Sequence, residues 1–333
     1  MQIEPPYLMF LGDAVDQLAA KTAQGIVDWC PDICIGQIRL PDCNADLGLS
    51  DLTLYEAREK GANTLIVGVA NRGGIIGEEW AKIFLEAIDL GFDIASGLHH
   101  KLIDIPAIEE LAAAKGQNLF DVRHPTNNFS LGNGKKRSGK RLLQVGTDCS
   151  VGKMYTALAI AEEMKHRGIK ASFRATGQTG IFIAGEGVSI DAVVSDFISG
   201  AVEELAPDND HDHWDIIEGQ GSLFHASFAG VTAGLIHGSQ PDALVLCHEP
   251  TRKHMRGLPG FPLPNLDDCM RLNLEVAKLT NPAARFIGIS MNTSNLESGE
   301  VDKLFDETSE KFGLPCVDPM RGGVGSLVDR LSN

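Results

Sequence analysis

Residues 142–165 read LLQVGTDCSVGKMYTALAIAEEMK, and this stretch decides the fold. An apolar run leads into a loop flanked by glycines, and a segment with helical periodicity follows from Lys153. Glycines let backbone N–H groups turn toward an anion, while the helix N-terminus adds about half a positive charge and the lysine a whole one. The stretch therefore predicts a phosphate-binding loop made of Gly146, Thr147, Asp148, Cys149, Ser150, Val151, Gly152 and Lys153.

Met154 follows the loop lysine, at the position where such loops carry a Ser or Thr whose hydroxyl binds Mg²⁺. A thioether offers a hard cation no oxygen ligand. We expect Met154 to border the bound phosphates without binding a metal, and we expect no resident metal in the protein. The loop then either binds phosphates without cleaving them or relies on metal ligands from other residues.

Length and composition bound the class of protein. A chain of 333 residues is typical of two domains, and its net charge of −16 disfavours nucleic acid and anionic membranes as partners. No apolar run approaches the roughly 20 residues of a membrane span. Seven scattered cysteines without a CxxC pair, and no secretory signal, predict a reduced, cytoplasmic protein. We expect a homo-oligomer that acts on small molecules.

Apolar runs alternate with helical segments along most of the chain. Residues 1–125 predict an N-terminal Rossmann-like domain with a parallel sheet, and residues 141–333 predict a C-terminal P-loop NTPase-like, doubly wound α/β domain. Residues 126–140 are polar and rich in Gly and Lys, as in a linker. Asn71 and Arg72 follow a predicted strand of the first domain and are candidate substrate-binding residues, although a plain glycine-rich turn is the alternative.

A carboxylate follows another predicted strand of the second domain. The motif DIIEGQGS, residues 215–222, ends this strand with Glu218. In phosphate-loop proteins an acidic residue from the neighbouring strand lies across from the loop, where it holds a metal, orients water or accepts a proton. Glu218 is therefore a candidate catalytic residue, and Gly221 and Ser222 are expected beside it at the substrate.

Three motifs in the same order resemble dethiobiotin synthetase and its relatives. They are GTDCSVGK (146–153), TGQTG (176–180) and EGQG (218–221). In those enzymes the second motif is a substrate loop, so the resemblance implies that Gln178 and Thr179 bind substrate. It covers the second domain only, and Met154 departs from the Thr that those enzymes carry.

A second resemblance spans nearly the whole chain. The loop GTDCSVGKM, the run from DIIEGQGS to HEPTRKHMRG (215–257) and the N-terminal domain are similar to a bacterial family that includes the D-glutamate N-acetyltransferases. This resemblance implies acetyl transfer from acetyl-CoA to the amine of an acidic D-amino acid, with D-glutamate as the favoured acceptor. The loop would then hold the phosphates of the cofactor, and Met154 would be no defect because no catalytic magnesium is needed.

Such a reaction needs a base, oxyanion donors and cations. Glu218 and His225 are both candidates for the base, Lys153 is placed with them at the reaction site, and backbone N–H groups of 219–222 are candidate donors. Basic residues that follow a predicted strand are candidates for the acceptor's carboxylates, unless they form a solvated loop. They are Arg252, Lys253, His254 and Arg256.

Two other functions stay open. In an ATP- and Mg-dependent ligase or kinase of the dethiobiotin synthetase type, Asp148 or Thr156 together with Glu218 would supply the metal ligands. A nucleotide-sensing regulatory module would bind a phosphate ligand without turnover.

Overall fold

The computed structural model describes residues 3–69, 74–125 and 128–331, so Asn71 and Arg72 lie outside the described residues. The chain forms two compact units. Unit 1 consists of Met1–Thr126 and Gly177–Ala192, and unit 2 consists of Asn127–Thr176 and Val193–Asn333. Among the described residues, no helix is both long and apolar enough to cross a membrane.

Unit 1 is built on a parallel five-stranded sheet in the order β2-β1-β3-β4-β5. Its strands are β1 (Tyr7–Gly12), β2 (Cys34–Arg39), β3 (Thr64–Val67), β4 (Asp93–Ser96) and β5 (Leu119–Asp121). Every residue of β1 is buried, as expected of a central parallel strand covered on both faces. The predicted Rossmann-like parallel domain is confirmed.

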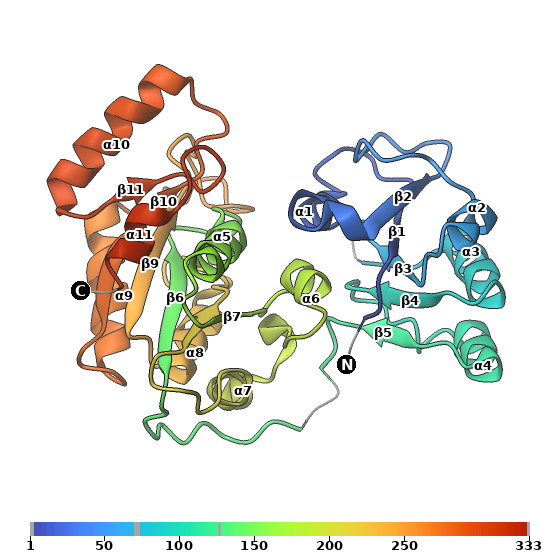
Figure 1. Ribbon diagram of the computed structural model, residues 1–333, viewed down its shortest axis with the longest axis horizontal. Helices are drawn as coiled ribbons and strands as arrows, with labels where there is room; N and C mark the ends of the chain where they lie inside the picture. Colours follow the sequence, from blue (N-terminus) through green and yellow to red (C-terminus); the bar gives the residue numbers. More distant parts are fainter. Residues whose placement is uncertain (1–2, 70–73, 126–127, 332–333) are drawn as a thin grey trace. The chain divides into compact units, whose positions relative to one another are not determined.

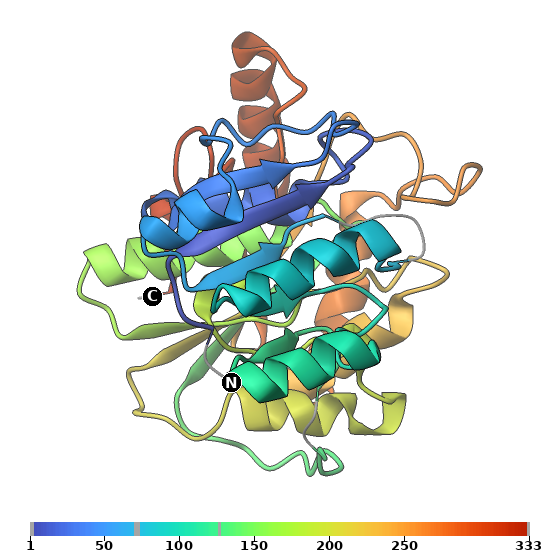
Figure 2. The ribbon, with the colours of Figure 1, turned by 90° about the vertical axis from the view of Figure 1, so that its right-hand side faces the viewer.

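Helices cover both faces of the sheet of unit 1. The helices of this unit are α1 (Lys21–Trp29), α2 (Leu54–Glu59), α3 (Glu78–Asp89), α4 (Pro106–Lys115) and α6 (Gln178–Ala184). Helices α3 and α4 lie side by side on one face, and α1 and α6 pack together on the other (Figure 1 and Figure 2). The sheet is thus the middle layer of three.

Unit 2 is built on a parallel six-stranded sheet in the order β11-β10-β9-β6-β8-β7. Its strands are β6 (Lys140–Gly146), β7 (Ala171–Arg174), β8 (Trp214–Ile217), β9 (Ala243–His248), β10 (Arg285–Met291) and β11 (Cys316–Val317). Its helices are α5 (Lys153–His166), α7 (Ile198–Leu205), α8 (Ala229–Ser239), α9 (Leu266–Lys278), α10 (Ser298–Phe312) and α11 (Gly325–Asp329). Helix α5 contacts α11, whereas α7, α8 and α9 follow one another on the other side of the sheet (Figure 1). This arrangement confirms the predicted doubly wound α/β domain.

A short segment leaves unit 2 and completes unit 1. Residues 177–192, which include α6, pack with the first unit: Tyr7 Oη donates to the Phe182 carbonyl at 3.5 Å, and Arg123 pairs with Asp191 at 2.5 Å. A Cβ added to Gly97 would lie 1.9 Å from Gln178 Oε1, so only glycine leaves room for this helix start. The contacts of this segment join residues far apart in the chain, so no local sequence pattern indicates that it belongs to unit 1.

The segment before β6 is held firmly against unit 2. Arg137 is buried, and its guanidinium donates to the carbonyls of Glu203 at 3.0 Å and Ala206 at 2.5 Å near the end of α7, and to that of Gly238 in α8. Carbonyls at the end of a helix lack partners within the helix, so a cation stabilises them. Arg137, which lies in the predicted linker, is therefore buried and binds carbonyls near the ends of two helices.

Candidate active site

The site forms where three neighbouring strands of unit 2 end. Strand β6 lies between β8 and β9, and all three strands run parallel. Their carboxyl ends therefore meet at one edge of the sheet, where α/β proteins bind ligands. The segments that follow are 147–153, 218–222 and 248–256, and each contains residues that the sequence predicted to be functional.

The loop after β6 has the conformation of an anion cradle. Ser150 adopts a φ of 52° and Gly152 a φ of 95°, and α5 begins at the next residue. Consecutive turns of this kind point backbone N–H groups inward. The neighbouring Gly219 packs so closely that an added Cβ would lie 1.6 Å from the Gln144 carbonyl oxygen. Within the loop Thr147, Asp148 and Val151 are buried, whereas Ser150 is exposed and Met154, in the first turn of α5, is half-buried.

Lys153 brings a buried positive charge to this loop. The side chain is 6% exposed, and its Nζ donates to the Asp148 carbonyl at 2.8 Å. Burial lowers the pKa of this ammonium. Among the described residues no carboxylate forms an ion pair with Lys153. A buried ammonium without an anionic partner, at the start of a helix, is suited to receive an anion from outside the chain.

The Asp148 side chain joins the loop to the segment after β9. It is fully buried, and its Oδ1 accepts from the Cys149 N–H at 2.7 Å. Its Oδ2 accepts from Arg252 Nη1 at 2.7 Å and from the Arg256 N–H at 2.8 Å. The carboxylate is therefore a structural centre of the site, fixed by three donors.

The two arginines of the segment 249–256 differ in how their charges are balanced. Arg252 pairs with Asp148 and Glu249 and donates to the carbonyls of Cys149 at 2.6 Å and Ser150 at 2.8 Å. Its donors are thus directed at the loop, which does not favour the predicted binding of an acceptor carboxylate. Arg256 donates from Nη1 to Ser150 Oγ and, within the described residues, has no ion pair.

Lys253 and His254 extend from the same segment. Both side chains are exposed, and the backbone of His254 bridges to Pro262. The structure does not bring them into the cluster around Asp148. The predicted contact of His254 with substrate stays a prediction.

His225 is held by both ring nitrogens. It is 2% exposed, its Nδ1 accepts from the Ser227 N–H at 3.1 Å, and its Nε2 lies 3.0 Å from the Arg256 carbonyl. A carbonyl can only accept, so this pattern assigns the proton to Nε2. The ring also stacks on Phe228, with 4.6 Å between the ring centroids. In this tautomer, neither nitrogen offers a lone pair to a substrate ammonium.

Glu218 follows β8 and is 4% exposed. Its Oε2 accepts from the Thr176 N–H at 2.9 Å and its Oε1 from Gln220 Nε2 at 3.1 Å. These two bonds orient the carboxylate beside the loop. The catalytic role of Glu218 stays a prediction.

The remaining predicted residues divide between the units. Gly221 has a φ of 66°, and Ser222 Oγ donates to the Thr147 carbonyl at 3.1 Å, so both belong to the wall of the loop. Gln178 and Thr179 start α6 and belong to unit 1, and their predicted contact with substrate stays a prediction.

Two of the metal ligands proposed for the ATP-dependent alternative, Asp148 and Thr156, are engaged by other partners. Ligand atoms of Asp148, Cys149 and His225 lie within 4.8 Å of one another, but the oxygens of the first and the nitrogens of the last are already hydrogen-bonded. Thr156 Oγ1 donates to the Gly152 carbonyl at 3.0 Å and lies 2.8 Å from Ser290 Oγ. A cation would have to displace these partners.

His248, the last residue of β9, was not among the residues predicted to be functional. Its Nδ1 lies 3.0 Å from Thr147 Oγ1. Burial, together with the charge of Arg252, lowers the pKa of His248 to about 4. The only sequence signal was its place at the end of a strand beside the loop strand.

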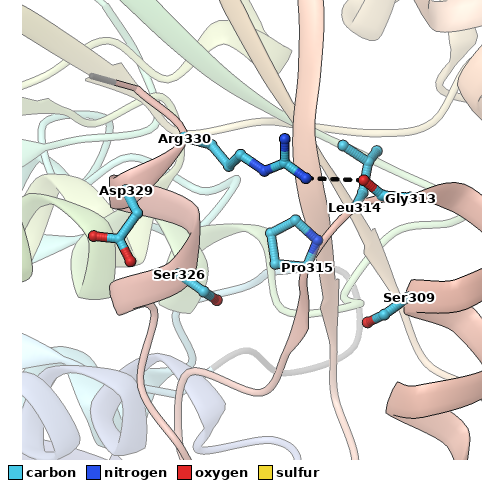
Figure 3. Close-up of a pocket in the computed structure, with 7 residues that line it drawn as sticks. All are labelled: Ser309, Gly313, Leu314, Pro315, Ser326, Asp329 and Arg330. Atoms are coloured by element: carbon cyan, nitrogen blue, oxygen red, sulfur yellow. Dashed lines mark hydrogen bonds between the residues drawn. The ribbon is translucent and has the colours of Figure 1, made fainter. Parts of the chain in front are cut away.

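A separate hollow of unit 2 lies at the amino edge of the sheet, by the end of α10 and the start of β11 (Figure 3). Arg330 Nη2 donates to the Gly313 carbonyl at 2.9 Å across it. Its lining consists of Ser309, Gly313, Leu314, Pro315, Ser326, Asp329 and Arg330. The phosphate loop is at the opposite, carboxyl edge, so this hollow is not part of the candidate active site.

Fold and site together define a phosphate-loop protein with an additional Rossmann-like domain. Two family models match it, described as a domain of unknown function (DUF1611_C) P-loop domain over residues 130–328 and a domain of unknown function (DUF1611_N) Rossmann-like domain over residues 39–125. The chain belongs to the DUF1611 family.

Full-length relatives extend this assignment. A protein of Tritonibacter scottomollicae named D-glutamate N-acetyltransferase is 57% identical, with 99% of each chain covered. A protein of Pseudoalteromonas sp with the same name is 51% identical, covering 99% of this chain and 100% of the relative. The crystal structure of a DUF1611 family protein from Anabaena variabilis superposes with a TM-score of 0.86 at 31% identity, covering 98% of this chain and 99% of the other. The relatives confirm the predicted class of enzyme, an N-acetyltransferase.

Proposed function

We propose that the chain transfers the acetyl group of acetyl-CoA to the amine of a D-amino acid, with D-glutamate as the acceptor. The names of both curated relatives support this acceptor. The observation that carries the role of the loop is Lys153, a buried ammonium in an anion cradle that no carboxylate pairs with among the described residues. The next residue, Met154, has no oxygen for a metal ion.

Coenzyme A fits this donor set. It carries a pyrophosphate and a 3′-phosphate, none of which the reaction cleaves, so the loop has only to bind them. Backbone N–H groups of 150–153 and the Lys153 ammonium would hold a phosphate. When bound, the cofactor supplies the acetyl group as a thioester.

Glu218 is the better candidate for the base. The amine of the acceptor is an ammonium at neutral pH and must lose a proton before it attacks. Glu218 presents a buried carboxylate beside the loop, whereas both nitrogens of His225 are occupied by backbone partners. We therefore assign proton acceptance to Glu218 and a positioning role to His225.

Thiol release tests the proposal. Purified protein is mixed with acetyl-CoA and D-glutamate, L-glutamate or D-aspartate, and free thiol and acetylated product are both quantified. We expect equal amounts of thiol and N-acetyl-D-glutamate, with a lower kcat/KM for the other acceptors. Absence of thiol release with every acidic D-amino acid, in protein that still binds ATP tightly, would contradict it.

A further inference from the structure

The backbone of Arg256 is fixed on both sides of its Cα. Its N–H donates to the buried Asp148 carboxylate at 2.8 Å, and its carbonyl accepts from the buried ring of His225 at 3.0 Å. Two buried side chains from different loops thus hold the two peptide groups that flank this Cα. Such a double constraint sets the position at which the side chain leaves the chain.

From this position the guanidinium reaches the outer side of the loop. Arg256 Nη1 donates to the hydroxyl of Ser150, which is exposed. The side chain of Arg256 is half-buried, and within the described residues no carboxylate pairs with it. Arg252, by contrast, is balanced by Asp148 and Glu249. Arg256 therefore brings an uncompensated positive charge to the rim of the loop.

The chemistry of the cofactor accounts for a cation at the rim. The loop would hold one phosphate with its N–H groups and Lys153, and a pyrophosphate carries a second phosphate on a shared oxygen. An arginine with donors to spare is the side chain best suited to bind that second group. We propose that Arg256 binds a second phosphate of coenzyme A, and that Asp148 and His225 are positioning residues for it.

This inference rests on the proposed function for the identity of the ligand, and it differs from the sequence-based expectation that Arg256 binds the acceptor's carboxylate. An arginine at the acceptor carboxylate would change the KM for D-glutamate. If the arginine binds a cofactor phosphate, its replacement should change the affinity for coenzyme A and leave the affinity for a phosphate-free fragment unchanged. The two roles are therefore separable by experiment.

Calorimetric titration of the full chain with coenzyme A and with pantetheine, which lacks the phosphates, tests the proposal. Arg256→Gln retains the backbone hydrogen bonds to Asp148 and His225, so the fold should keep its Tm. We expect the Kd for coenzyme A to rise about tenfold, a typical value for one charge-assisted contact, and the Kd for pantetheine to stay constant. Arg256→Lys should recover part of the loss. Lys278→Gln, which removes an exposed charge at the end of α9, should have the wild-type Kd.

Three results would overturn the proposal. One is a wild-type Kd for coenzyme A in Arg256→Gln. Another is an equal loss of coenzyme A and pantetheine binding, which would indicate a structural role. The third is a raised KM for D-glutamate with unchanged coenzyme A binding, which would place Arg256 at the acceptor. Binding that depends on Arg256 in a protein without acetyl transfer would instead refute the proposed function alone.

Discussion

Arg252 donates to Asp148 at 2.7 Å across 104 residues of sequence, and this bond joins the phosphate loop to the segment that follows β9. The carboxylate is fully buried and also accepts from two backbone N–H groups. Loop and segment are therefore one structural element at the edge of the sheet, and the predictions below follow from its charges.

Asp148→Asn should destabilise the protein strongly. The amide would place an NH₂ group, itself a donor, against the N–H groups and the Arg252 guanidinium that donate to the carboxylate. It would also remove the negative charge that pairs with Arg252. Breaking a buried charge pair costs about 3 to 5 kcal/mol, so we expect a loss of that order in the free energy of unfolding from urea titrations. Asp210→Asn, which removes an exposed partner of Lys170, is the matched control and should cost less than about 1 kcal/mol. Equal losses in the two variants would contradict the central role of Asp148.

Lys153→Met should separate stability from function. The substitution keeps the length of the side chain and removes a buried charge, so we expect the ligand-free protein to gain about 1 to 2 kcal/mol. Coenzyme A should then no longer raise the Tm, and kcat/KM for acetyl-CoA should fall at least 100-fold, by roughly 3 kcal/mol of lost phosphate binding. A variant that still binds coenzyme A like the wild type would refute the role of the loop.

Glu218→Gln and His225→Asn distinguish a base from a positioning residue. If Glu218 accepts the proton, its replacement should lower kcat by about 100-fold or more and remove the acidic limb of the pH profile. His225→Asn should keep that limb and mainly raise the KM for acetyl-CoA, because the support of the Arg256 carbonyl changes. Loss of the acidic limb in His225→Asn alone would reverse the assignment.

His248 predicts a dependence of stability on pH. Burial lowers its pKa to about 4, whereas the unfolded side chain has the ordinary pKa of a histidine, 6.5. Between these values the unfolded state binds the proton and the folded state does not, so stability falls as the pH falls from about 6.5 to about 4. The loss from this group is about 3 kcal/mol. His248→Gln, which retains an acceptor for Thr147, should flatten the decrease in Tm over this window; an unchanged slope would contradict the assignment.

Much of the site was predictable because it depends on local patterns. Buried parallel strands are apolar runs in the sequence, and the residues that follow them meet at one edge of the sheet. The sequence alone therefore predicts that Lys153 and Glu218 lie at one site. The lack of a metal-binding oxygen in the side chain of Met154 also follows from the sequence alone. The relatives confirm the class of enzyme, an N-acetyltransferase, whereas the role of Met154 stays a prediction.

The rest depends on contacts that no local pattern records. A run of basic residues looks the same whether it is solvated or folded inward, so the pairing of Arg252 with Asp148 and the burial of Arg137 were not foreseen. Likewise the packing of α6, which begins at Gln178, with unit 1 was not foreseen, because its partners come from strands and helices more than 100 residues away.

The central claim is that the loop holds cofactor phosphates for acetyl transfer and needs no metal to do so. The most direct measurement is the rate of N-acetyl-D-glutamate formation from acetyl-CoA, with an excess of chelator and then with added Mg²⁺. The account predicts the same kcat/KM in both conditions and no dependence on ATP. Acetyl transfer that is absent in both, together with Mg²⁺-dependent formation of ADP when D-glutamate and ATP are supplied, would contradict it.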